Sequence, residues 1–325
     1  MKHAFLFAAP VAALVCVVTA PAKPAHAWGE IGHKVIARIA WDAMKPETRA
    51  KIIALLDAAP TDADLASLRP AGVAKPDADR VLFEASATWP DIMRAKKTDA
   101  EKARNAKYHH GPWHYYDIFF EMDESGKVTE RNDMKNESEN ALVALNEQSA
   151  TLADTAKPES DRAIAIAWIG HLVGDLHMPL HNVARISAEN PKGDQGGNLV
   201  KLEPKPAGSG YQKNLHGFWD DLPDSQFPAS PGEEKEARIA RIALVAQSAL
   251  PKTIFERAGL TQTGNAAGWN REGAELAITR VYPGVTPLML PGDAYTREAR
   301  DTALVGLAKA GYRLAATLEA ALAGK

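Results

Sequence analysis

Helical periodicity dominates this chain and leaves little room for elements of another kind. Apolar residues recur at intervals of three and four, as in Val35, Ile36, Ile39 and Ala40, and this spacing predicts a helix with one buried face. The same reading predicts helices over residues 31–44, 46–56, 134–152, 160–178, 235–249, 266–280 and 294–322. The stretches 57–80, 95–113 and 189–215 are rich in Pro, Gly, Asp and Lys and are predicted as loops. Because no alternation of strands with helices is present, we expect an all-α fold in a single domain.

One small element is expected outside this pattern. The residues NLVKLE, which begin at Asn198, are followed by PKPAGSG. This order predicts one arm and the turn of a small β-hairpin.

The first 27 residues have the pattern of a secretory signal. Lys2 and His3 precede an apolar stretch, and a Pro-broken run of small residues then ends in Ala25-His26-Ala27. The apolar core is too short and too interrupted to span a bilayer. We therefore expect residues 1–27 to be a cleaved signal peptide and residues 28–325 to form one mature domain. The protein is then periplasmic or secreted, with an uncleaved N-terminal anchor as the alternative.

Cleavage after Ala27 would change the chemistry of the new terminus. It frees the α-amino group of Trp28, which together with the Trp28 carbonyl can chelate a metal ion. It also removes Cys16, the only cysteine, so the mature domain has no disulfide and must be stabilised by its core.

The overall charge excludes a broadly basic nucleic-acid-binding surface. The net charge is −3, with a sequence pI of about 6.4. A polyanionic substrate would need a concentrated local source of positive charge. A cluster of bound metal ions is one such source.

Histidines and aspartates occur at metal-ligand spacing in several places. His171 and Asp175 are four residues apart in IGHLVGDLHMPLH and face the same way on one helix, and Pro179 then ends that helix before His181. His216 and Asp220 repeat the offset in NLHGFWDD. Further candidate ligands are His33, Asp91 and His114. Such a set without cysteine is typical of catalytic zinc.

Other readings of these residues stay open. A single pair at this spacing is more often a surface hydrogen bond than a metal site. His177 lies about 200° around the helix from Asp175, so we expect a structural role for it, as for His109 and His110.

The motifs WGEIGH, ATWPD, PWHYYD, HLVGDLHMPLH, GGN and NLHGFWD, in that order, resemble a known family. The chain is similar to the zinc-dependent single-strand-specific nucleases (the S-one/P-one nucleases), with bacterial zinc phospholipase C as a more distant relative. GDAYTREARD and AKAGYRLA resemble the last helix of that family, so the likeness extends over the mature chain.

The resemblance implies a mainly helical domain with a trinuclear zinc site, and assigns ligands by matching position. The first Zn²⁺ would be held by Asp91, His114, His171 and Asp175. The second would be held by His181, His216 and Asp220. The third would be held by the amine and carbonyl of Trp28 and by His33, with Asp175 bridging it to the first.

The resemblance also implies roles in catalysis and substrate binding. Asp91 would orient the attacking water, and Arg94 would stabilise the transition state. Asn198 would contact the substrate, and Tyr115 and Asp117 would stack on and hydrogen-bond a base. From the sequence alone, Arg94 could instead form an ion pair with Asp91 or Asp99, Tyr115 could be a packing residue, and Asn198 could serve only a turn.

The expected function is zinc-dependent hydrolysis of single-stranded DNA and RNA to 5′-phosphorylated products, together with 3′-nucleotidase activity. The substrates would be single-stranded nucleic acids and nucleotides, with no obligate protein partner and no membrane anchor. Two alternatives remain: a phospholipase C on the same scaffold, and a non-catalytic periplasmic zinc-binding protein.

Overall fold

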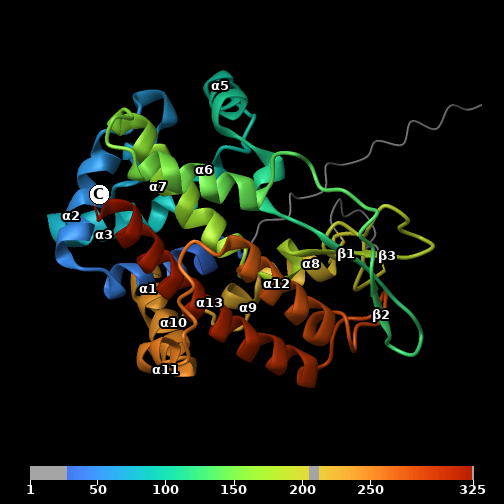
Figure 1. Cartoon of the computed structure of the whole chain (residues 1–325). Coiled ribbons are helices and arrows are strands. Elements are labelled where there is room, and N and C mark those ends of the chain that lie inside the picture. Colours follow the sequence, from blue (N-terminus) through green and yellow to red (C-terminus); the bar gives the residue numbers. More distant parts are fainter. Residues whose placement is uncertain (1–27, 205–211, 324–325) are drawn as a thin grey trace, which may run out of the picture.

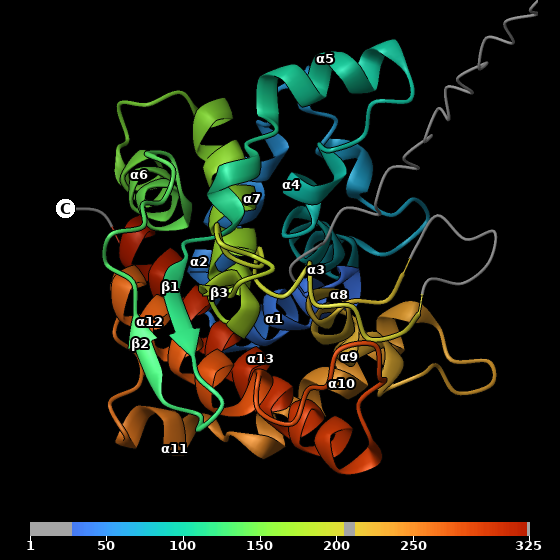
Figure 2. The ribbon, with the colours of Figure 1, turned by 90° about the vertical axis from the view of Figure 1, so that its right-hand side faces the viewer.

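The computed structural model describes residues 28–204 and 212–323, and the predicted signal peptide lies outside these residues. Helices make up most of the described chain (Figures 1 and 2). They are α1 Glu30–Ala43, α2 Pro46–Asp57, α3 Lys75–Ser86, α4 Trp89–Ile92, α5 Asp99–Tyr108, α6 Ala141–Ala153, α7 Glu159–Asp175, α8 Leu215–Asp220, α9 Leu222–Ser225, α10 Lys235–Ala249, α11 Lys252–Arg257, α12 Ala266–Leu276 and α13 Asp293–Leu322. The strands are β1 Ile118–Met122, β2 Val128–Glu130 and β3 Val183–Ile186.

Helix α1 lies at the centre of the helical body. It packs against α13, α10, α3 and α7. Val35, Ile36 and Ile39 are completely buried, as the apolar spacing of this stretch predicts. The approach of α13 depends on Gly311, because a Cβ built there would lie 2.5 Å from Cβ of Ile39. A side chain at this position would push the two helices apart.

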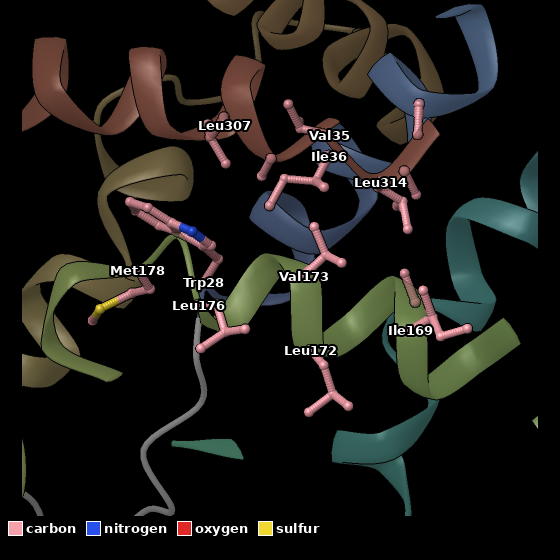
Figure 3. Close-up of a cluster of buried hydrophobic side chains, with 14 of the residues drawn as sticks. Trp28, Val35, Ile36, Ile169, Leu172, Val173, Leu176, Met178, Leu307 and Leu314 are labelled. Carbon is pink, nitrogen blue, oxygen red and sulfur yellow. The ribbon is translucent and has the colours of Figure 1, made fainter. Parts of the chain in front are cut away.

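Helix α7 is buried on all sides over its C-terminal two thirds. From Ala165 to Asp175 every residue is buried, so this helix is not amphipathic but forms part of the core itself. Figure 3 shows Val173 of α7 pointing toward α1, whereas Leu172 points away from it on the opposite side of α7. His171 and Asp175 are therefore carried inside the molecule, where an unpartnered polar group costs free energy.

A small mixed sheet lies to one side of the helices (Figure 2). Its order is β2-β1-β3, with β1 antiparallel to β2 and parallel to β3. The connection from β1 to β3 passes through α6 and α7, as a parallel pair requires. The sheet thereby fixes both the segment before β1 and the segment before β3 at one end of α7.

The mainly helical fold class predicted from the sequence is confirmed, but several boundaries were wrong. The predicted helix 134–152 begins only at Ala141, where Asn140 caps it, and the predicted helix 266–280 ends as α12 at Leu276 and continues as a π-helical turn, Ala277–Val281. The predicted loop 57–80 includes the start of α3, and the predicted loop 95–113 contains α5.

The hairpin predicted from Asn198 is supported in part, because the Leu202 N–H donates to the Lys213 carbonyl and the Leu215 N–H donates to the Val200 carbonyl, both at 2.9 Å. Of the described residues there, Lys201 and Asn214 form a single antiparallel bridge, and the expected turn lies outside the described residues. A further antiparallel pair, β1–β2, was not predicted from the sequence. In the described part of the chain no helix is long and apolar enough to cross a membrane.

Candidate metal centre and substrate cavity

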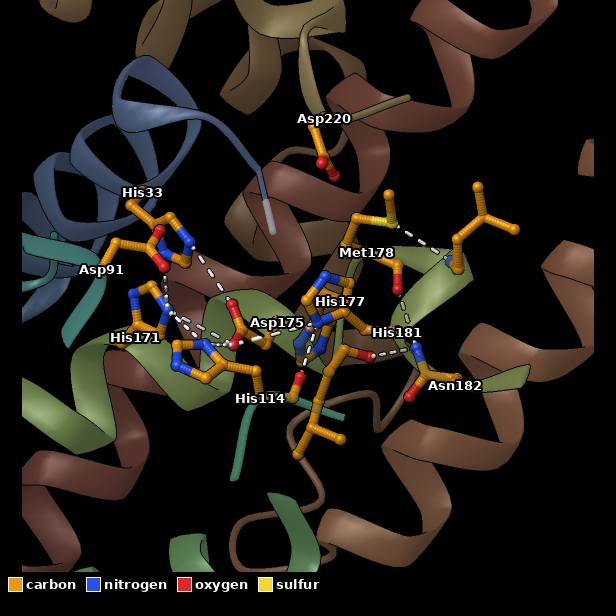
Figure 4. A network of polar contacts seen from close by, with 12 residues as sticks. His33, Asp91, His114, His171, Asp175, His177, Met178, His181, Asn182 and Asp220 are labelled. Atoms are coloured by element: carbon orange, nitrogen blue, oxygen red, sulfur yellow. Dashed lines mark hydrogen bonds and ion pairs between the residues drawn. The ribbon is translucent and has the colours of Figure 1, made fainter. Parts of the chain in front are cut away.

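Histidine and aspartate side chains from distant segments meet at the C-terminal end of α7. They come from α1, α4, α7, α8 and the two 3₁₀ turns Gly111–His114 and Pro179–His181. Figure 4 shows His33, His114 and His171 arranged around Asp175, with Asp91 beside them. The predicted ligand side chains fall into three groups, and within each group the ligand atoms lie within 4.8 Å of one another. The first two groups share His171: His33, Asp91 and His171; and His114, His171 and Asp175. The third is His181, His216 and Asp220.

Asp175 is the common neighbour of the first two groups. Its Oδ2 lies 3.0 Å from His114 Nδ1 and 3.4 Å from His171 Nε2, and its Oδ1 lies 3.4 Å from His33 Nε2. Asp91 Oδ1 is 3.8 Å from His171 Nε2. One carboxylate thus faces imidazoles on both of its oxygen atoms, which is the arrangement that a bridging ligand needs.

Two glycines of α7 permit this close packing. A Cβ built on Gly174 would lie 2.7 Å from His33 Nδ1, so only glycine lets α1 bring His33 against the helix. The rings of His33 and His171 are stacked with their centroids 4.1 Å apart. Gly170 similarly allows Ala87 to approach, and the Ala87 carbonyl accepts a hydrogen bond from His171 Nδ1 at 2.8 Å.

The third group lies beside the first two. His181 Nε2 is 3.1 Å from His216 Nε2, which in turn is 3.6 Å from Asp220 Oδ2. His181 Nδ1 donates to the His114 carbonyl at 2.5 Å, and His216 Nδ1 donates to the Gly196 carbonyl at 2.7 Å. These backbone acceptors hold the Nδ1 proton, so Nε2 is left as the ligand atom. Metal-binding histidines are oriented in the same way.

The donor set fits zinc. His114 Nε2 and Asp220 Oδ1 are buried and, among the described residues, have no hydrogen-bond partner. Burial lowers the pKa of His114 and His181 well below the ordinary value, and that of His216 to about 4, so these imidazoles are neutral as ligation requires. Burial together with Asp91 and Asp175 raises the pKa of Asp220 well above its usual range. Divalent cations would offset this crowding of buried carboxylates.

Trp28 brings the start of the mature domain to this place. Its indole is completely buried between Leu176, Met178 and Leu307 (Figure 3). The next residue, Gly29, donates its N–H to the Asp220 carbonyl at 2.9 Å. The predicted N-terminal chelate is therefore anchored beside a predicted ligand, although its free amine depends on the predicted cleavage.

The metal centre opens into a cavity of about 680 Å³. Its wall includes His114, His181 and His216 together with the predicted substrate residues, which are Arg94, Tyr115, Asp117 and Asn198. Arg94 Nε lies 3.0 Å from Asp91 Oδ1, so it forms the ion pair and also faces the cavity. Asn198 Nδ2 donates to the Gln195 carbonyl, and so serves a turn at the cavity wall.

Tyr115 and Asp117 differ in their surroundings. The Tyr115 side chain is exposed, whereas Tyr116 is half-buried and its N–H is bonded to the His181 carbonyl. Burial, with a smaller effect of Asp194, raises the pKa of Asp117 to about 7. Asn136 accepts from the Asp117 N–H and donates to its carbonyl, which fixes the backbone at this position.

The residues that shape the GGN loop were not predicted from the sequence. Asp194, which is completely buried, accepts hydrogen bonds from the Arg185 N–H and from the Tyr282 hydroxyl. Gly196 has φ +58, and a Cβ there would lie 2.1 Å from the Leu180 carbonyl oxygen. An aspartate two residues before a double glycine was the available signal for a tethered turn.

The three histidines predicted to be structural have different positions. His177 faces away from the metal centre, with Nδ1 on the Val173 carbonyl and Nε2 3.0 Å from Arg313, and His110 stacks on Trp113. His109, by contrast, lines the cavity together with Lys96. A purely structural role for His109 therefore does not match its position.

Neutral imidazoles and carboxylates around a substrate-sized cavity, in a helical domain, define the class of a metal-dependent hydrolase. Comparisons with known proteins identify the family within this class. A model of the family described as S1/P1 Nuclease matches residues 28–323. The chain belongs to the S1/P1 nuclease family, a family of zinc enzymes, and is a hydrolase that acts on phosphodiester bonds.

Individual relatives are distant but cover nearly the whole chain. Endonuclease 4 of Arabidopsis thaliana is 26% identical over 333 aligned residues, which cover 96% of this chain and 95% of that protein. Nuclease P1 of Penicillium citrinum is 22% identical, and the aligned residues cover 89% of this chain and 95% of that protein. Among solved structures, the alpha-toxin of Clostridium perfringens matches with a TM-score of 0.37 and 13% identity, over 86% of this chain and 64% of that one.

Proposed function

We propose that the protein hydrolyses single-stranded DNA and RNA to products with a 5′-phosphate, and removes the 3′-phosphate from nucleotides, with three zinc ions. The observation that carries this proposal is the continuity of the cavity. Its wall includes His114 of one ligand group and His181 and His216 of another. The same wall includes the exposed aromatic ring of Tyr115. A phosphate and an adjacent unpaired base would then be bound at once.

The proposed ligand sets are those of the sequence analysis. Asp91, His114, His171 and Asp175 would hold one ion; His181, His216 and Asp220 would hold a second; Trp28 and His33 would hold the third, with Asp175 shared. Zinc in this position supplies positive charge for the phosphate and lowers the pKa of water to near neutrality.

The chain's own residues would align the reaction. Asp91 would hold the attacking water, and Arg94, which already lies against Asp91, would donate to the oxygen atoms on which negative charge grows. Hydrolysis joins the water oxygen to phosphorus and breaks the bond from phosphorus to the 3′ oxygen. The 3′ oxygen leaves as a hydroxyl and the phosphate remains on the 5′ side.

Single-strand preference follows from Tyr115. Only an unpaired base presents its face, and stacking on an aromatic side chain contributes about 1–3 kcal/mol per base. The half-buried Asp117 beside it would hydrogen-bond the edge of the base. If the predicted signal peptide is cleaved, this activity would lie in the periplasm or outside the cell.

The test compares Tyr115→Ala with Tyr115→Phe on single-stranded DNA, duplex DNA, RNA, a 3′-nucleotide and phosphatidylcholine. We expect Tyr115→Ala to lower kcat/KM on single strands by about 5- to 150-fold, while Tyr115→Phe, which keeps the ring, stays near the wild type. Equal wild-type rates on single-stranded and duplex DNA would contradict the proposal. Turnover of phosphatidylcholine alone would favour the phospholipase alternative.

A further inference from the structure

The wall of the substrate cavity carries basic groups that the proposed reaction does not use. Lys96 and His109 line the cavity along with Arg94, from which Lys96 is separated by one residue. Of the described residues at this wall, Asp117 is the acidic one. Arg94 is paired with Asp91, and Lys96 adds a further positive charge to this wall of the cavity.

Lys96 differs from the two lysines of α5. Lys102 and Lys107 of α5 are bound to Asp99 and Asp62. For Lys96, no carboxylate of the described chain lies within the 4.0 Å of an ion pair, and its side chain is exposed. An ammonium group with no fixed counter-ion, at the wall of a nucleic-acid cavity, is free to bind a phosphate oxygen.

His109 lies next to Lys96 in space although it follows the far end of α5. Asn105 of α5 donates to the Met93 carbonyl at 2.8 Å, and this bond ties the helix to the segment of Arg94 and Lys96. Burial lowers the pKa of His109, and the charges of Arg94 and Lys96 lower it further, so the ring is a neutral hydrogen-bonding group. Its Nδ1 is buried without a hydrogen-bond partner among the described residues.

We propose that Lys96 and His109 form a binding site for a second phosphate of the strand, next to the phosphate that is hydrolysed. This inference rests on the proposed function and adds a substrate preference to it. The ligand is a phosphodiester group of a neighbouring nucleotide, which oligonucleotides have and dinucleoside monophosphates lack. The site favours longer single strands over minimal substrates.

Steady-state kinetics on two substrates test the site. We expect Lys96→Ala to lower kcat/KM on a ten-nucleotide oligothymidylate by about 5- to 10-fold, and to lower it less on a dinucleoside monophosphate. His109→Gln should lower the oligothymidylate value by about 2- to 10-fold, the range for one neutral hydrogen bond. The matched control is Lys97→Ala, because Lys97 is also exposed and is not among the residues of the cavity wall. That variant should match the wild type on both substrates.

A binding measurement separates the loss of the Lys96 charge from a general loss of active protein. Fluorescence anisotropy over a salt series measures the binding constant for a phosphorothioate oligothymidylate. In Lys96→Ala, the slope of the logarithm of this constant against the logarithm of the salt concentration should be smaller in magnitude by about 0.7. The slope should be unchanged in His109→Gln, which removes no charge. An unaltered slope in Lys96→Ala, or equal losses of kcat/KM on the two substrates, would overturn the second phosphate site. Wild-type protein that cleaves neither substrate would instead overturn the proposed function.

Discussion

Individual glycines determine whether the predicted metal ligands can come together. Gly174 makes room for His33 against α7, and Gly196 makes room for the turn whose carbonyl holds His216. The ligands themselves are ordinary histidines and aspartates. They can approach one another because the neighbouring glycines have no Cβ. A methyl group at either glycine would displace a ligand rather than merely strain a loop.

Gly196→Ala tests this directly. We expect loss of zinc from the group of His181, His216 and Asp220 and at least a tenfold loss of nuclease activity, because the new Cβ would lie 2.1 Å from the Leu180 carbonyl oxygen. The matched control is Gly232→Ala, which has φ +76 and nothing within 4 Å of its built Cβ. It carries a similar backbone penalty of about 1 kcal/mol without the clash. Equal zinc content in the two variants would contradict the account.

Glu84 makes stability depend on pH. The completely buried Glu84 accepts a hydrogen bond from Arg80 at 2.7 Å, yet burial raises its pKa to about 7 from an ordinary value of 4.5. The folded state therefore binds this proton more tightly than the unfolded chain. The resulting stabilisation is complete below about pH 4.5 and is lost as the pH rises through 7.

Urea unfolding of wild type and Glu84→Gln at pH 4.5 and pH 7.5, with a chelator present, measures the effect. Relative to the variant, which cannot ionise here, the wild type should lose on the order of 3 kcal/mol of unfolding free energy between the two pH values. Parallel behaviour of the two proteins would show that Glu84 does not titrate in this range.

At the scale of elements, buried helices were predictable and exposed or short ones were not. Residues 235–249 were predicted as a helix and form α10 within the same bounds, because regular apolar spacing marks a helix that packs on one face. Helix α5 was missed because Tyr108 is its one buried residue, so no apolar face is visible. Strand β1 was missed because IFFEM is too short to show a period of two.

The candidate site, like the helices, could be predicted from the sequence only in part. The His171–Asp175 and His216–Asp220 offsets and the resemblance identified the side chains that the structure brings together. The supports of the GGN loop were not predictable, because Tyr282 reaches Asp194 from 88 residues further along the chain. The cavity position of His109 likewise depends on how α5 is tied back to Met93.

The start of α5 carries a signal that sequence reading can use. Thr98 accepts from the Glu101 N–H at 3.1 Å while the Glu101 carboxylate accepts from the Thr98 N–H at 2.7 Å, a complete capping box. Thr98→Ala should destabilise the first turn by about 0.5–2 kcal/mol. Amide hydrogen exchange in α5 should become about 2- to 30-fold faster, with α6 amides in the same sample as the control. Unchanged exchange in α5 would show that the box adds nothing to the helix.

At the scale of the whole molecule, the candidate metal centre joins distant segments of the described chain, with Trp28 as a proposed further ligand. Trp28 and His33 lie at its start, α7 in the middle, and His216 and Asp220 beyond the sheet. A mature domain without disulfides would then depend on its metal ions as well as on its core. Removing the ions leaves Asp91, Asp175 and Asp220 close together in a buried site, which opposes folding.

The most direct test of this account is the zinc content of the processed protein, measured by native mass spectrometry on a chain that begins at Trp28. We expect three ions for each chain. A form with one extra residue before Trp28 should hold two, because its terminal amine is displaced from the third site. A correctly processed chain that binds one ion or none when saturated with zinc would contradict the trinuclear centre.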